Sequence, residues 1–157
     1  MVVVRKLRPE DDLTPVLELC REFFAEYQSH HKEFFDTDNL SYSDIIGRFQ
    51  ESVQSSSCAT IIALIDNTIV GYSSITIREQ PRFYKIKKVG VISALMIKKE
   101  YRRCGIATRI LNEANLFFRE HGIKYYTFYT AVTNQAAVRL YEKLGMAPLH
   151  LSFIGET

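Results

Sequence analysis

The chain has 157 residues, of which 46% are apolar and 24% charged, and its formal net charge is +2, which fits one soluble globular domain over residues 1–157. No apolar run approaches the ~20 residues that cross a bilayer, and Met1–Arg5 is too short and too soon charged for a signal peptide. The three cysteines Cys20, Cys58 and Cys104 are an odd number and lack metal-ligand spacing, so we expect no metal site. Together these features predict a protein without membrane attachment in a reducing, cytoplasmic location.

The first half of the chain is predicted to contain a strand, two helices and a β-hairpin. These elements lie at Val2–Leu7, Leu13–Tyr27, Ser41–Val53, Ala59–Ile65 and Thr68–Ile77. Asp12 is expected to cap the first helix, and Ser41 with Asp44 resembles a capping box for the second. Asp66–Asn67 is a favoured two-residue hairpin turn, and Gly71 in the following strand indicates a bulge or a close approach.

The second half is predicted to alternate three strands with two helices. These elements lie at Val89–Ile97, Ile106–Arg119, Tyr125–Thr130, Asn134–Lys143 and Leu149–Ile154. Gly122 and Gly145 follow the two helices where a left-handed glycine commonly ends a helix. The order β-α-α-β-β-β-α-β-α-β indicates a mixed α/β layer structure rather than a regular βαβ repeat.

The segment Tyr101–Thr108 carries the strongest functional signal. It lies between a predicted strand and a predicted helix, where the backbone N–H groups of the helix start lack intrahelical partners and attract anions. Gly105 allows a close approach of the ligand, and Arg102 and Arg103 favour a phosphate. The spacing fits neither a P-loop nor a dinucleotide-binding turn. The alternative is a tight turn that carries two surface arginines.

Charge is distributed unevenly along the chain. Residues 82–109 contain nine basic residues and one acid, a net +8, whereas residues 1–60 contain six basic residues and eleven acids, a net −5. This polarity predicts a domain that meets an anion on one side and a cation on the other. Two solvated faces without a partner are the alternative.

A second motif follows the next predicted strand. Residues Asn134–Gly145 read Asn-x-x-Ala-x-x-Leu-Tyr-x-x-Leu-Gly, and residues Arg102–Ala107 read Arg-x-x-Gly-x-Ala. Together with the strand-like run Ile92–Ile97, these motifs resemble the GCN5-related N-acetyltransferase (GNAT) superfamily, most closely over Val89–Met146. The resemblance implies an α/β (α+β) three-layer fold, in which helices flank a mixed, mostly antiparallel sheet and splayed central strands hold acetyl-CoA.

The resemblance also implies roles for individual residues. In the family, the glycine-bearing loop holds the pyrophosphate of acetyl-CoA through backbone N–H groups, and the preceding strand bonds the pantetheine amides. The matching cofactor-binding positions are Leu95, Met96, Ile97, Arg102, Arg103, Cys104, Gly105, Ile106, Ala107, Thr108 and Asn134. Tyr141 matches a tyrosine that commonly protonates the departing thiolate. The alternative role for Tyr141 is a core residue on a short amphipathic helix.

The reaction that we expect for this chain is direct acetyl transfer from acetyl-CoA in a ternary complex. The amine attacks the thioester carbonyl, and a backbone N–H, expected to be that of Met96, stabilises the carbonyl oxygen. Many members carry a glutamate base on the central strand, but Ser93 stands there and cannot serve. Another base is needed, from Glu26, Glu33, His30 or His31 acting through water, or none if the amine arrives neutral.

The polar segment 28–40 is predicted to be a loop. The family lines its acceptor pocket from the segment between the first two helices, and acidic side chains there suit a cationic amine. The acceptor-binding residues implied are Glu26, His30, His31 and Glu33, with Asp36 and Asp38 beside them. A solvated loop is the alternative, and a metal held by the two adjacent histidines is not favoured.

Two further features have less specific interpretations. The basic run Arg82–Lys88, with two aromatic residues, resembles a nucleic-acid patch in composition, but a role beside the cofactor phosphates or plain solvation is simpler. Cys104 lies between cations at a helix start, so its thiol could be acidified and oxidisable. An incidental exposed thiol is the favoured interpretation of that cysteine.

The sequence therefore predicts an acetyl-CoA-dependent N-acetyltransferase that acts on the primary amine of a small molecule or a peptide. One alternative is a CoA-binding module with little catalysis, motivated by the missing carboxylate at Ser93. A nucleic-acid-binding domain is a less favoured third interpretation. The family often dimerises, so a homodimer is one expected assembly. The identity of the amine stays open, because a fold does not fix a substrate.

Overall fold

A single five-stranded sheet organises the protein, whose computed structural model describes residues 1–31, 33–35, 37 and 39–157. The strands follow one another across the sheet in the order β1-β2-β3-β4-β5. They are β1 Val2–Lys6, β2 Cys58–Ile65, β3 Thr68–Glu79, β4 Lys88–Ile97 and β5 Tyr126–Phe128. Neighbours from β1 to β4 are antiparallel, whereas β5 joins β4 in parallel.

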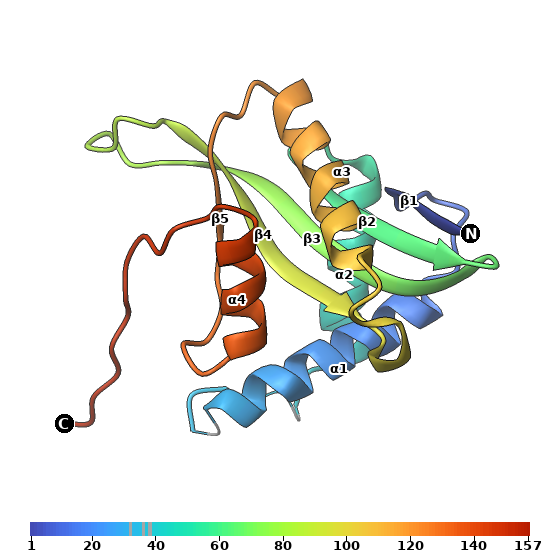
Figure 1. Ribbon diagram of the computed structural model, residues 1–157, viewed down its shortest axis with the longest axis horizontal. Coiled ribbons are helices and arrows are strands. Elements are labelled where there is room, and N and C mark those ends of the chain that lie inside the picture. Colours follow the sequence, from blue (N-terminus) through green and yellow to red (C-terminus); the bar gives the residue numbers. More distant parts are fainter. Residues whose placement is uncertain (32, 36, 38) are drawn as a thin grey trace.

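Helices cover both faces of this sheet, as Figure 1 shows. They are α1 Thr14–His30, α2 Tyr42–Gln54, α3 Ile106–Glu120 and α4 Gln135–Lys143, with a 3-10 turn η1 at Lys99–Tyr101. One buried cluster joins the sheet to α3 through Ile110 and Phe117, and a second joins it to α1 and α2 through Leu17 and Phe49. The predicted three-layer α/β architecture is confirmed.

Several local signals act as expected. The Ser41 hydroxyl accepts a hydrogen bond from the Asp44 N–H, and the Asp44 carboxylate accepts one from the Ser41 N–H, which completes a capping box. The hairpin turn has Asp66 at φ 48° and Asn67 at φ 62°, the paired left-handed conformations of a type I′ turn. The N-cap of α1 is Leu13 rather than the predicted Asp12, but the Asp12 carboxylate still accepts from the Thr14 N–H at 2.9 Å.

Two glycines allow close packing against the sheet. A Cβ on Gly71 would lie 2.5 Å from the Ile97 side chain and 3.0 Å from the Met96 carbonyl oxygen. A Cβ on Gly90 would lie 2.6 Å from the Phe118 ring. These are closer than Cβ contacts in folded proteins, so glycine at these two positions lets β3 meet β4 and lets α3 pack onto the sheet.

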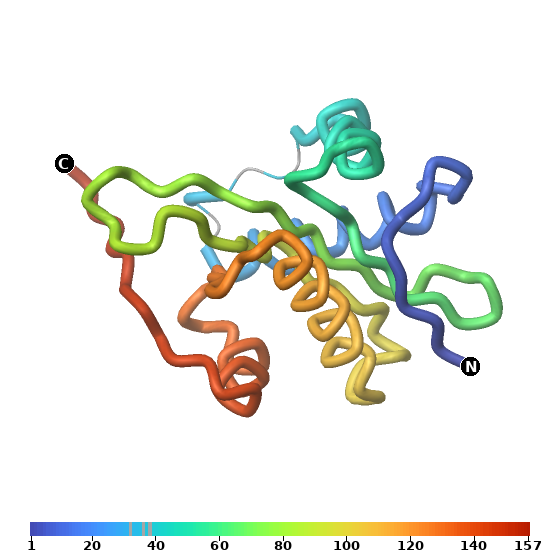
Figure 2. The backbone as a smooth tube through the Cα atoms, turned by 90° about the horizontal axis from the view of Figure 1, so that it is seen from above, coloured from blue at the N-terminus to red at the C-terminus, as the bar shows by residue number. Residues whose placement is uncertain are grey.

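The chain departs from the sequence prediction in its last segment. We predicted a strand at Leu149–Ile154, and no regular structure forms there. This tail extends away from the body in Figures 1 and 2, and its large apolar side chains are exposed, Phe153 by 90%. An alternating apolar pattern makes a strand only where a neighbouring strand accepts its hydrogen bonds. Among the described residues, none pairs with this segment.

Other boundaries shift by a few residues. Helix α1 continues through His30 into the segment predicted as a loop, while β5 is shorter than the predicted Tyr125–Thr130. In the part of the chain that the structure describes, no helix is long and apolar enough to cross a membrane.

Candidate functional site

The turn that enters α3 presents a row of unused backbone donors. Arg103 at φ 65° and Gly105 at φ 77° adopt left-handed conformations that point successive N–H groups outward. Among the described residues, no group accepts from the N–H groups of residues 103–108, and the first helical bond runs from the Arg109 N–H to the Gly105 carbonyl. Consecutive free N–H groups at a helix start form an anion-binding concavity. This geometry supports the anion site predicted from the sequence.

Arg102 occupies a different position from the one expected of a phosphate ligand. Its own N–H already donates to the Lys99 carbonyl at 3.3 Å. Its Nε donates to the Ile97 carbonyl at 2.9 Å, and its Nη2 donates to Glu26 Oε1 at 2.7 Å. The guanidinium is therefore committed to the end of β4 and to α1, and only the backbone after it belongs to the row of free donors.

A gap opens between β4 and β5 directly before this turn. The two strands pair only over Gly90–Ile92, and Ser93 is an extra residue that shifts the register of β4 against β3. From Ser93 onward, no described residue continues the ladder on the β5 side of β4. The bulge and the short β5 thus produce the splayed strands that the family resemblance predicted.

The direction of the β4 backbone groups follows from the register. The Lys98 N–H donates to the Val70 carbonyl of β3 at 2.9 Å. Backbone groups alternate sides along a strand, so the Met96 N–H also faces β3 and the Leu95 and Ile97 N–H groups face the gap. The Ile97 carbonyl that accepts from Arg102 lies on this same side. Leu95 is therefore better placed than Met96 to stabilise an oxyanion in the gap.

Tyr141 of α4 lies beside this gap. Its ring stacks on Phe128 of β5 with centroids 4.3 Å apart and 28° between the planes. Burial, and secondarily the nearby Tyr27 hydroxyl, raises the pKa of the Tyr141 phenol well above its usual value. The phenol therefore stays protonated at neutral pH, the form that a general acid requires.

Asn134 has a structural contact that the sequence analysis did not predict. Its side-chain oxygen accepts from the Ala137 N–H at 3.2 Å, which makes it the N-cap of α4. This contact explains an asparagine at the helix start independently of any ligand. Its predicted cofactor contact stays a prediction.

The residues predicted to bind the acceptor divide into two groups. Glu26 pairs with Arg102, and His30 Nδ1 shares a hydrogen bond of 2.9 Å with the Thr133 hydroxyl, in the loop between β5 and α4. His31 instead accepts from the Phe34 N–H at 3.2 Å, and Glu33 is exposed. Asp36 and Asp38 lie outside the described residues. The sequence analysis missed Thr133, although its position next to Asn134 was a usable signal.

Three other predictions concern a catalytic base, a reactive thiol and a metal site. The Ser93 hydroxyl donates to the Ser74 carbonyl at 3.3 Å, and no carboxylate stands in its place. Cys104 is exposed, and its thiol lies 3.5 Å from the Arg102 carbonyl. Within the described ranges, no three His, Cys, Asp or Glu side chains gather closely enough to hold a metal ion.

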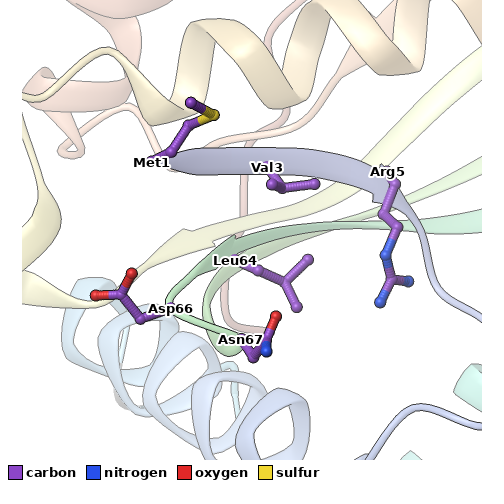
Figure 3. Close-up of a pocket in the computed structure, with 6 residues that line it drawn as sticks. All are labelled: Met1, Val3, Arg5, Leu64, Asp66 and Asn67. Atoms are coloured by element: carbon purple, nitrogen blue, oxygen red, sulfur yellow. The ribbon is translucent and has the colours of Figure 1, made fainter.

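Two shallow cavities lie outside the gap. One of about 290 Å³ is at the outer edge of the sheet, where β1 meets the hairpin turn between β2 and β3, as Figure 3 shows. The other, of about 300 Å³, lies between α1 and α2 and is lined by residues that include Phe24, Gln28 and Leu40. The first is lined by Met1, Val3, Arg5, Leu64, Asp66 and Asn67, and none of these belongs to the anion site. The second borders the segment predicted to face the acceptor.

Known proteins share this architecture. Residues 17–146 match the profile of the acetyltransferase (GNAT) family. An N-alpha-acetyltransferase of Saccharolobus solfataricus is 34% identical over 104 residues, which are 61% of this chain and 60% of that protein, so the aligned part spans less than two thirds of its length.

Solved structures agree on the fold. A tetramutant of the BH1408 protein from Bacillus halodurans superposes with a TM-score of 0.83 at 21% identity, covering 99% of each chain. The aminoglycoside acetyltransferase AAC(6')-Iy, in complex with a bisubstrate analogue, superposes with a TM-score of 0.75 at 14% identity, covering 100% of this chain and 98% of that one. The profile match, which extends over most of the chain, shows that the protein belongs to the acetyltransferase (GNAT) family.

Proposed function

We propose that this protein is an acetyl-CoA-dependent N-acetyltransferase that acts on a primary amine by direct transfer in a ternary complex. The observation that carries the proposal is the row of N–H groups at residues 103–108, which have no acceptor in the described part of the chain and follow the segment of β4 that β5 no longer pairs. The archaeal relative is an N-alpha-acetyltransferase, and AAC(6')-Iy was solved with a CoA-linked bisubstrate analogue. Both names support a CoA donor and an amine acceptor for this chain.

In this proposal the pyrophosphate of acetyl-CoA lies on the free N–H groups of residues 103–108, beside the positive end of the α3 dipole. The exposed Arg103 side chain adds a cation there. The pantetheine arm runs along the gap side of β4, where Leu95 and Ile97 offer amide groups that a sheet neighbour would otherwise use. Asn134 stands near the opposite wall, at the start of α4.

The chemistry would begin with attack of the amine nitrogen on the thioester carbon. The Leu95 N–H would stabilise the negative charge that develops on the carbonyl oxygen. Collapse of the intermediate breaks the carbon–sulfur bond, and Tyr141 would protonate the leaving thiolate. The extra proton on the new amide nitrogen would then pass to the Tyr141 phenolate and restore the acid. Much of the acceleration would come from holding both reactants together, since positioning can lower a barrier by roughly 7–11 kcal/mol.

The proton on the incoming ammonium group must leave before attack. Of the four candidate bases, Glu26 is already ion-paired, Glu33 is exposed, and His31 bonds Phe34 in its own segment rather than the β5–α4 loop. We assign the role to His30, whose contact with Thr133 places it at the wall formed by the β5–α4 loop. A neutral imidazole can accept the proton of an incoming ammonium group.

The acceptor class is suggested by the charge of the N-terminal part of the sequence, which contains α1 and His30. The N-terminal segment carries the excess of acids, with five more acidic than basic residues over positions 1–60. A cationic amine on a small molecule or at a peptide N-terminus would be attracted there. The relatives differ in acceptor type, because one is named an N-alpha-acetyltransferase and others are named aminoglycoside acetyltransferases.

A homodimer is the assembly that we propose. The exposed apolar tail at Leu149–Ile154 and the outer edge of β5 are both without strand partners in the described chain. An unpaired strand edge is a template for pairing with another chain. The tail of one copy on the edge of a second would satisfy both features at once.

The proposal is tested by following thiol release from acetyl-CoA with a panel of peptides that have free N-termini and a panel of aminoglycosides. Release that depends on one amine supports a transferase. The rival function, a CoA-binding module with little catalysis, would give measurable CoA binding and no release with any member of either panel.

A further inference from the structure

The second half of α1 is attached to both sides of the gap. On the donor side, Glu26 Oε1 accepts from Arg102 Nη2 at 2.7 Å. On the opposite side, His30 Nδ1 bonds the Thr133 hydroxyl at 2.9 Å. Glu26 and His30 are four residues apart and so share one face of the helix. This face of α1 therefore spans the distance between the cofactor turn and the β5–α4 loop.

Arg102 joins three elements at one point. It is the C-cap of η1, its Nε donates to the Ile97 carbonyl at the end of β4, and its Nη2 reaches α1. The Met96 sulfur lies 3.5 Å from the same Nη2. A planar guanidinium can hold a carbonyl and a carboxylate at the same time, whereas a lysine ammonium at the end of a flexible stem fixes neither direction.

The position of this arginine is unexpected for the first residue of a phosphate-binding motif. Its side chain points to a carboxylate and not to the free N–H groups, so Arg103 is the arginine left for the anion. The Arg102 and Glu26 side chains remain 37% and 43% exposed. A pair that exposed contributes little to global stability. The pair therefore matters for the position of α1 relative to the turn and not for the stability of the fold.

We propose that Arg102 and Glu26 are positioning residues that fix α1 relative to the cofactor turn. The pair keeps the acceptor-facing side of α1, which includes His30, at a set distance from the thioester. Glu26 thus acts through Arg102 and does not bind the amine itself. The inference rests on the proposed function for its kinetic consequence, but the mechanical link between α1 and the turn can be measured without substrate.

The test is a double-mutant cycle of Arg102→Met, Glu26→Gln and the combined variant, with the exchanged pair Arg102→Glu/Glu26→Arg. Glu22→Gln is the matched control, because Glu22 lies one turn earlier on α1, is exposed, and forms no ion pair or hydrogen bond with another element among the described residues. Amide hydrogen exchange of residues 23–31 in the free protein is the first readout. We expect each single variant to speed this exchange equally, the combined variant to add nothing, and the exchanged pair to restore protection in part.

The second readout separates positioning from a structural role. With acetyl-CoA and an amine from the panels above, Glu26→Gln and Arg102→Met should raise the KM for the amine by about fivefold or more and leave the KM for acetyl-CoA nearly unchanged. Arg103→Met should instead raise the KM for acetyl-CoA and leave the KM for the amine nearly unchanged. Additive effects of Arg102→Met and Glu26→Gln, unchanged exchange, or a loss of CoA affinity in Arg102→Met as large as in Arg103→Met would overturn the inference. Failure of the wild type to bind CoA would instead overturn the proposed function, while the exchange data would still decide whether the pair holds α1.

Discussion

Tyr141 of α4 stacks on Phe128 of β5 at a centroid distance of 4.3 Å, which holds a protonated phenol beside the strand that diverges from β4. Tyr141→Phe keeps the ring and this stacking but removes the proton. General acids contribute about 10²–10⁴-fold, so we expect kcat to fall by roughly 10²-fold with little change in stability. The measurement is kcat across pH with the best amine of the panel, and an equal rate for both proteins at every pH would exclude the acid role.

The pH profile should also reflect the raised pKa of Tyr141. Because burial keeps the phenol protonated above its usual range, loss of that proton should not reduce the rate between pH 7 and about 10. The base that we assign to His30 is tested separately by substitution. His30→Gln should lower kcat, whereas Glu33→Gln, at an exposed position, should leave it nearly unchanged. An unchanged kcat in His30→Gln would show that the base lies elsewhere.

The contact between Gly90 and Phe118 gives a prediction for stability. Gly90→Ala places a Cβ 2.6 Å from the Phe118 ring, inside a packed core. We expect a loss of about 1–3 kcal/mol in the free energy of unfolding, measured by urea denaturation. The matched control is Gly47→Ala on an exposed face of α2, where nothing lies within 4 Å and where alanine should stabilise by about 0.5–1 kcal/mol. Equal effects at the two positions would contradict this packing.

Asp11 should make the fold sensitive to acid. It accepts two hydrogen bonds of 2.6 Å from Arg5, which lower the pKa of its carboxyl group. A lowered pKa means that this stabilisation is complete above the unfolded value near 3.9 and is lost as pH falls through the folded value. Asp11→Asn should cost about 1–2 kcal/mol at pH 7 and less at pH 3. A cost independent of pH, in urea titrations beside the exposed control Glu51→Gln, would argue against the ion pair as its source.

The tail gives a prediction for assembly. If the tail of one copy pairs with β5 of another, side chains at alternate positions should be buried in the dimer. Leu151→Lys and Phe153→Lys should then dissociate it, while Ser152→Lys, on the opposite side of the pattern, should be tolerated. Light scattering coupled to gel filtration measures the mass. A monomeric wild type, or equal effects of all three substitutions, would contradict the pairing of the tail with β5 of a second copy.

Local signals predicted most of the fold. The capping box at Ser41, the turn at Asp66–Asn67 and the glycine after α3 depend on a few neighbouring residues, so a sequence alone predicts them. The prediction of a strand at Leu149–Ile154 was wrong because a strand depends on a non-local partner. That partner must come from a distant part of the chain or from another chain. The same limit affected α1, whose end depends on contacts of His30 rather than on local propensity.

The sequence predicted which residues belong to the candidate site better than it predicted the contacts that these residues make. The motif at residues 102–107 predicted an anion site, and its unused N–H groups support that prediction. It could not reveal that Arg102 faces α1, because Glu26 is distant in sequence. It also could not show that Leu95 and not Met96 faces the gap, since that depends on the register with β3.

The most direct measurement of the central claim is a mass-spectrometric assay of the amine after incubation with acetyl-CoA, performed with wild type and with Tyr141→Phe. The account predicts one acetyl group on the amine nitrogen, stoichiometric release of free CoA, and a rate reduced by roughly 10²-fold in the variant. Tight CoA binding by the wild type, without acetylation of any peptide N-terminus or aminoglycoside, would contradict it.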